Sequence, residues 1–111
     1  MKLTNKEEVM CLRDAVVGLQ DFVKCCSNGE LPYFYRFLDY MKNNIEIFLR
    51  VGGRDIYALE KVLYRSWYEA NDFRIGLSTF QISAETETES IEIYYQYAIL
   101  VHEVSRYFKK Q

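Results

Sequence analysis

The segment at residues 86–110 has an apolar pattern that strongly limits what this chain can fold into. Its large apolar residues recur at steps of three and four positions: Tyr94, Tyr97, Val101, Val104 and Phe108. This spacing matches one face of an α-helix, and it continues for about five turns, far beyond the usual length of a β-strand. The segment therefore predicts a long helix against which the rest of the chain packs.

A second row of residues lies on the far side of the same predicted helix: Tyr95, Ile99, His102 and Arg106. On a surface helix this side is normally polar. Because Tyr95 and Ile99 are largely apolar, we expect that something besides the main core covers them.

Three earlier segments repeat the helical spacing, and each has a recognisable start. Thr4 and Glu7 form a capping-box pattern, in which the Thr side chain accepts a hydrogen bond from a free backbone amide. Pro32 fits the first position of a second helix, and Asp55 fits the N-cap of a third. Short connections favour antiparallel neighbours. The sequence therefore predicts an all-α bundle of four principal helices, near residues 5–27, 32–51, 55–72 and 86–109.

Residues 74–85 lack the helical spacing, and a structureless stretch of about twelve residues is long for a compact domain. Part of this stretch alternates like a strand, so the alternative is an α+β fold with a small hairpin at 75–97. We expect instead an extended arm around 74–85 that packs on the bundle. The reason is that Thr86 and Glu89 supply a second capping box at the start of the last helix.

The chain is long and apolar enough to fold without a metal ion or a disulfide. It has 111 residues, of which 50% are hydrophobic and 16% aromatic, so we expect a single helical domain over 1–111. Three cysteines, two of them adjacent, are typical of buried thiols in a reducing cytosol: Cys11, Cys25 and Cys26. Neither a signal peptide nor a membrane-spanning apolar run is present in the sequence. We therefore expect a soluble cytoplasmic protein.

Charge is distributed unevenly along the chain. The formal net charge is −2 and the pI is near 5.4, which argues against a dedicated nucleic-acid-binding protein. Between Ile75 and Ser105 the sequence has no Lys or Arg, but it has five acidic residues there: Glu85, Glu87, Glu89, Glu92 and Glu103. The pattern predicts that one end of the last helix is negative.

The sequence gives little support for catalysis. His102 is the one histidine, and no Cys or Ser is placed beside it by the sequence pattern. The ligand spacings of zinc and di-iron sites are missing, and Gly52–Gly53 is an isolated pair that ends a helix, so it does not form a phosphate-binding loop. We therefore expect no catalytic, cofactor or metal site, and a non-enzymatic protein.

A protein-binding surface is the function that the remaining features favour. Carboxylates can speed the approach of a basic partner, and Tyr can anchor it. The candidate partner-binding residues combine both kinds: Glu69, Asp72, Glu85, Glu87, Glu89, Glu92, Tyr95 and Ile99. We expect an inhibitor that blocks a basic, nuclease-type toxin by occlusion, as an antibacterial toxin-immunity protein does. The simpler interpretation of the same carboxylates is helix capping and solubility.

Two other functions fit the sequence. The first is a helical oligomerisation or regulatory subunit that forms a homodimer through Tyr95, Ile99 and Tyr107. The second is weak RNA binding by stacking and phosphate contacts, through a basic and aromatic flank of the third helix. That flank consists of Arg54, Tyr57, Lys61, Tyr64, Arg65 and Tyr68. The acidic neighbours of these cations weigh against RNA.

Overall fold

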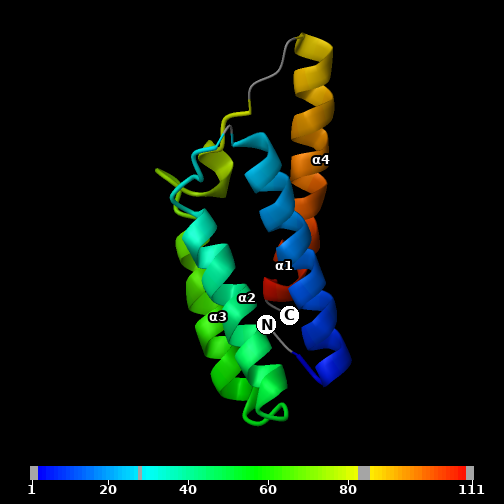
Figure 1. The fold of residues 1–111 in the computed structure, drawn as a ribbon, viewed down its shortest axis with the longest axis vertical. Helices are drawn as coiled ribbons and strands as arrows, with labels where there is room; N and C mark the ends of the chain where they lie inside the picture. The colour runs from blue at the N-terminus through cyan, green and yellow to red at the C-terminus, as the bar shows by residue number, and fades with distance from the viewer. Residues whose placement is uncertain (1–2, 28, 83–85, 110–111) are drawn as a thin grey trace.

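A computed structural model of the chain describes residues 3–27, 29–82 and 86–109. These residues form four α-helices and two short 3-10 helices, and they contain no strand. The α-helices run alternately up and down the long axis of the molecule (Figure 1): α1 Lys6–Cys26, α2 Tyr35–Arg50, α3 Ile56–Ala70 and α4 Glu87–Ser105. The predicted all-α bundle is confirmed. The alternative hairpin at 75–97 is wrong, because residues 87–97 lie inside α4.

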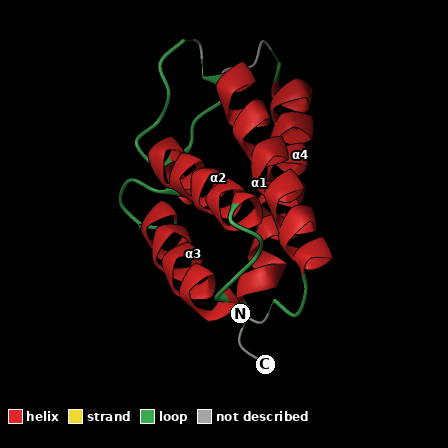
Figure 2. Ribbon diagram, turned by 60° about the horizontal axis from the view of Figure 1, so that its bottom comes forward, coloured by secondary structure: helices red, strands yellow, loops and turns green. Residues whose placement is uncertain are grey.

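The helices pack in the order α3, α2, α1, α4, so α3 and α4 are the outer members of the array. Helix α2 packs against both α3 and α1, while α4 packs mainly against α1. Figure 2 shows α4 along one side of the molecule. Among the residues that the structure describes, none buries the long side of α4 that carries Tyr95 and Ile99.

Helix α1 has one buried apolar face, whose residues follow the helical spacing: Val9, Leu12, Val16, Leu19 and Val23. The helix begins after Asn5, whose side-chain oxygen accepts a hydrogen bond from the Glu8 amide at 2.9 Å. The predicted cap, Thr4, instead donates its hydroxyl hydrogen to the Glu8 carboxylate. The capping prediction is one residue early, because Asn and Thr are both good N-caps and stand side by side.

Helix α2 begins at Tyr35, three residues later than predicted. A turn comes first, in which the Tyr35 amide donates to the Pro32 carbonyl at 3.0 Å and the Phe34 side chain enters the core. Pro32 therefore belongs to the turn that precedes the helix. The buried residues of α2 follow the helical spacing of three and four positions: Leu38, Met41, Ile45 and Phe48.

Helix α3 starts where the sequence predicted, with Asp55 as its N-cap. The Asp55 carboxylate accepts from the Ala58 amide at 3.0 Å. Before it, Gly52 and Gly53 have φ angles of 93° and 72°, a region that glycine enters without strain, and they end α2. The buried face of α3 contains Leu59, Leu63, Ser66, Trp67 and Ala70.

Helix α4 starts as predicted but is buried less than its pattern suggested. The Thr86 hydroxyl oxygen accepts from the Glu89 amide at 3.0 Å, which confirms the predicted cap. Within the helix only Tyr97 and Val104 are buried, and Phe108 is buried in the 3-10 helix η2 that follows, Arg106–Phe108. Tyr94, expected in the same buried stripe, remains exposed. The difference arises because α4 lies at the edge of the array.

The segment between α3 and α4 folds back onto the bundle. Residues Leu77–Thr79 form the 3-10 helix η1, and the Leu77, Phe80 and Ile82 side chains are buried. Gly76 has no room for a side chain, since a Cβ there would lie 2.4 Å from the Asp72 carbonyl oxygen. The predicted extended arm at 74–85 thus includes a helical turn, and residues 83–85 lie outside the described part of the chain.

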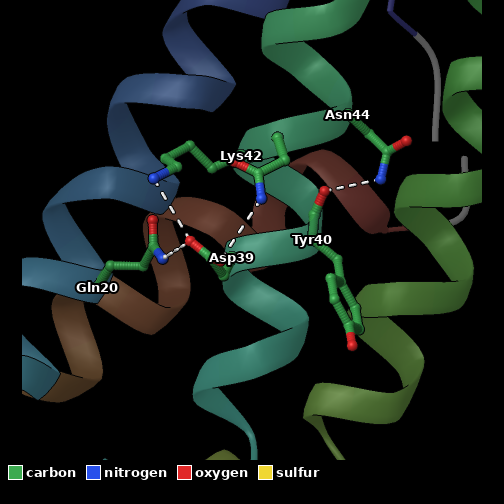
Figure 3. A network of polar contacts seen from close by, with 6 residues as sticks. Gln20, Asp39, Tyr40, Lys42 and Asn44 are labelled. Atoms are coloured by element: carbon green, nitrogen blue, oxygen red, sulfur yellow. Dashed lines mark hydrogen bonds and ion pairs between the residues drawn. The ribbon is translucent and has the colours of Figure 1, made fainter.

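A small polar network links α1 to α2 (Figure 3). The Gln20 side chain is buried in α1, and its amide nitrogen donates to Asp39 of α2 at 3.3 Å. The Lys42 ammonium nitrogen lies 3.4 Å from the same carboxylate, and the side-chain amide nitrogen of Asn43 donates to it at 3.4 Å. Gln20 is thereby satisfied at the helix interface, and the pairing helps to fix how α1 and α2 sit together.

The cysteines differ from the prediction of buried thiols. Cys11 and Cys25 are exposed, and Cys26 is partly buried beside the core. All three are free. Neighbouring residues of a helix point about 100° apart, so Cys11, next to the buried Leu12, lies outside the narrow buried face of α1. Burial raises the pKa of the Cys26 thiol, with the neighbouring Cys25 adding to the effect.

Candidate functional site

The N-terminal end of α4 extends beyond the ends of the other helices (Figure 1). Glu87 and Glu89 lie in its first turn, Glu92 follows about one turn later, and all three are exposed. Glu85, also predicted to bind a partner, lies outside the described residues. Carboxylates in a first turn interact favourably with the partial positive charge of the helix N-terminus. These residues therefore stabilise α4 and also make its free end acidic.

The side of α4 opposite the buried Tyr97 is apolar at its centre. Tyr95 is 68% exposed and Ile99 is 45% exposed. Together with their neighbours along the helix they form an exposed line that we call the outer row: Thr88, Glu92, Tyr95, Ile99, His102 and Arg106. The predicted second row is therefore confirmed as a surface feature, and no described residue of the chain buries it.

Glu69 and Asp72 do not join the acidic end of α4. They lie at the C-terminal end of α3, which Figure 1 places well below the start of α4 along the long axis. Asp72 is also engaged locally: its carboxylate accepts from the Arg74 amide at 2.8 Å and pairs with the Arg74 guanidinium at 3.3 Å. These bonds hold the pKa of Asp72 below its usual range. The structure thus separates the seven predicted residues that it describes into two groups, one on α4 and one at the end of α3.

Two tyrosines of α4 fasten the segment that precedes the helix, a role that the sequence reasoning missed. The Tyr97 hydroxyl donates to the Leu77 carbonyl at 2.7 Å, and burial raises the pKa of this hydroxyl. The Tyr94 hydroxyl accepts from the Ile82 amide at 2.8 Å. Their spacing of three positions was visible in the sequence, but their hydrogen-bond partners depend on how the segment folds back.

A cavity of about 440 Å³ lies between α4 and this fastened segment. Most of its wall is apolar or aromatic, and its polar groups come from Asn71, Ser78, His102 and Ser105. His102 is exposed at this wall. In the described part of the chain, no group of three His, Cys, Asp or Glu side chains is placed to hold a metal ion. The non-enzymatic character of the protein stays a prediction.

The basic and aromatic flank of α3 is exposed as a continuous face. Tyr57 and Tyr68 are largely exposed, and the Lys61 ammonium lies 4.7 Å from the centre of the Tyr57 ring. Tyr64 lies between two hollows, one of about 400 Å³ toward Lys61 and one of about 190 Å³ toward Phe108. This face lies on the other outer helix of the array, separate from the outer row of α4.

Comparisons with protein-family models, with curated proteins and with solved structures found no match to this chain. Among the described residues, no helix is both long enough and apolar enough to cross a membrane. The exposed surfaces themselves are the remaining guide to function, and the outer side of α4 combines exposed carboxylates with exposed Tyr95 and Ile99.

Proposed function

We propose that this chain is a non-enzymatic inhibitor that binds a basic protein partner through the acidic half of α4. The observation that supports it is that the exposed carboxylates of that half adjoin the exposed Tyr95 and Ile99 at the centre of the helix. No Lys or Arg occurs between residues 75 and 105 to weaken the negative potential. A nuclease-type toxin is a partner of opposite, complementary charge, because its nucleic-acid site is basic.

The two kinds of residue contribute differently to such a complex. Glu87, Glu89 and Glu92 act at a distance and raise the rate of encounter with a basic surface. Tyr95 and Ile99 act on contact, because burying an exposed aromatic ring and a branched aliphatic side chain slows dissociation. An inhibitor of this kind needs no reactive group, since it works by covering the partner's active site.

The test first asks whether a toxin with a basic nuclease domain is encoded beside the gene for this chain. The association rate with that domain is then measured by stopped-flow fluorescence, and the absence of such a neighbouring gene counts against the proposal. Reversal of Glu87, Glu89 and Glu92 to Lys is expected to lower the rate by about 10- to 100-fold at low salt, because electrostatic steering is lost. The rate for the unmodified chain should also fall as salt rises.

The matched control reverses Glu7, Asp14 and Glu46 to Lys. All three are exposed, they lie on α1 and α2, and Glu7 occupies a helix first turn as Glu87 does. This variant has the same change in net charge and should associate at nearly the unmodified rate at equal ionic strength. Equal slowing in both variants, or none in either, would show that the acidic half of α4 is not the binding surface.

A second candidate function, binding of single-stranded RNA, is favoured by the exposed face of α3. Tyr57, Tyr64 and Tyr68 offer rings for stacking, and Lys61 and Arg65 offer charge for phosphates. Fluorescence anisotropy with a labelled oligouridine at low salt tests it. A signal that disappears in the Tyr64→Ala/Tyr68→Ala variant supports this function, and no signal at millimolar protein removes it.

A further inference from the structure

The outer row of α4 is unusual because its centre is apolar while its two ends carry opposite charge. Tyr95 and Ile99 occupy the middle. On the N-terminal side lie Glu92 and the acidic first turn, and on the C-terminal side lie His102 and, at the start of η2, Arg106. The Arg106 side chain is 56% exposed and its guanidinium lies 3.9 Å from the Glu103 carboxylate, a distance that leaves it accessible to a second carboxylate. Two copies of this row are therefore complementary to each other when their helices run antiparallel.

Helices that are apolar on all sides are normally covered on all sides. Helix α4 is covered by α1 and by the segment that Tyr94 and Tyr97 fasten, and both lie on its buried side. Figure 1 shows the N-terminal half of α4 at an outer edge of the molecule, and the residues of the outer row are exposed along the rest of its length as well. A second molecule can therefore reach the whole length of the outer row.

We propose that the outer row binds the outer row of a second copy of this chain, with the two α4 helices antiparallel about a two-fold axis. The centre of the row falls midway between Tyr95 and Ile99. In that register Tyr95 packs against the partner's Ile99, and Ile99 packs against the partner's Tyr95. A two-fold interface uses the same patch on both copies, so each apolar contact occurs twice.

The same register also pairs the charges. Glu92 lies opposite the partner's His102, and Thr88 lies opposite the partner's Arg106. Because Glu87 and Glu89 flank Thr88, the partner's guanidinium comes close to an acidic helix terminus. A parallel arrangement would place each Glu92 beside the partner's Glu92, which is repulsive. Charge complementarity thus selects the antiparallel pair.

The size of the contact sets the expected strength. An interface that is one helix wide lies near the lower limit of about 1,000 Å² for specific association, so we expect a dimer that dissociates in the micromolar range. This inference does not depend on the proposed inhibitor function. It does use Tyr95 and Ile99, so a chain in the dimer cannot bind a basic partner through them at the same time.

Sedimentation velocity on the full chain, over a concentration series from about 1 to 500 μM, tests the proposal. A reversible monomer–dimer equilibrium is expected. The Tyr95→Ala/Ile99→Ala variant should weaken the dimer at least about tenfold, because these side chains form the centre of the interface. The Tyr57→Ala/Val62→Ala variant is the matched control: it removes an equally exposed Tyr and aliphatic side chain from α3 and should leave the equilibrium unchanged.

Charge exchange tests the antiparallel register. Glu92→Lys alone and His102→Glu alone should each weaken the dimer, by about three- to tenfold, because the first removes the carboxylate that faces the partner's imidazole and the second places two carboxylates opposite one another. The Glu92→Lys/His102→Glu double variant should recover the affinity, which only an antiparallel pairing of these positions allows.

Three results would overturn the proposal: a monomer at every concentration, a dimer insensitive to Tyr95→Ala/Ile99→Ala, or a double charge variant weaker than both single ones. None of them bears on the inhibitor function, because toxin binding is measured separately and requires only the monomer. Circular dichroism of each variant confirms that α4 remains helical, as expected for substitutions at exposed positions.

Discussion

Helices α1 and α4 are similar in length and differ sharply in what surrounds them. Helix α1 lies between α2 and α4 and buries a continuous line of side chains at Val9, Leu12, Val16, Leu19 and Val23. Helix α4 has as strong an apolar content but buries only Tyr97 and Val104 along its length. The comparison shows that apolar spacing predicts a helix reliably, whereas the extent of its burial depends on how many neighbours the fold gives it.

The largest expected difference in the free energy of unfolding is between equivalent truncations to alanine in the two helices. Leu12→Ala removes a side chain that is 0% exposed in α1, so we expect it to lower the free energy of unfolding by about 2–5 kcal/mol. Ile99→Ala on the outer row of α4 should change it by less than about 0.5 kcal/mol at concentrations where the chain is monomeric. Urea denaturation of both variants measures the difference. Similar losses would mean that α4 is buried by something within the monomer.

An intermediate effect is expected where α4 does contact the rest of the chain. Tyr97→Phe removes the hydroxyl that donates to the Leu77 carbonyl and should lower the free energy of unfolding by about 1–1.5 kcal/mol, because that carbonyl loses one donor and keeps the Phe80 amide at 3.3 Å. Tyr95→Phe is the control, since the Tyr95 ring is largely exposed and the change should be near zero. Thermal and urea unfolding would measure both, and equal effects would contradict the anchoring role of Tyr97.

The smallest effect concerns the two N-caps. Asn5→Ala removes the cap of α1 and should lower the free energy of global unfolding by about 1 kcal/mol. Thr86→Ala removes the cap of α4, whose first turns extend beyond the bundle, so the loss should appear mainly as local fraying. Hydrogen exchange resolved by NMR should show faster exchange in the first turns of α4 with little change in global stability. A full global loss in Thr86→Ala would place the start of α4 in the cooperative core.

Much of the fold was predictable because its signals are local. The four helices, the Asp55 and Thr86 caps and the Gly52–Gly53 helix end all follow from side-chain chemistry within a few residues. The errors are also local. The sequence pattern predicts Thr4 as the cap of α1, where the neighbouring Asn5 is an equally good cap and is the one used. It also predicts Pro32 as the first residue of α2, whereas a turn at Pro32 precedes the helix, which begins at Tyr35.

The candidate site was predictable only in part. Glu87, Glu89, Glu92, Tyr95 and Ile99 share one helix, so their proximity follows from the helical repeat alone. The addition of Glu69 and Asp72 assumed that the end of α3 meets the start of α4, and the structure places them apart. Contacts between distant segments leave no periodic signal in a single sequence. The hydrogen bond from the Tyr97 hydroxyl to the Leu77 carbonyl is another such contact, and the sequence pattern does not reveal it.

Local side-chain chemistry is enough to specify amphipathic helices with defined starts, and to make the last of them acidic in its first half with a second row that is apolar at its centre. Which apolar faces are buried depends on how the helices are arranged in space. Each of the inner helices, α1 and α2, has a neighbouring helix on both sides, whereas α4 lies at the edge and keeps its outer row in solvent. The physical reason is that hydrophobic burial is non-directional: a side chain gains by leaving water but does not specify which surface it packs against.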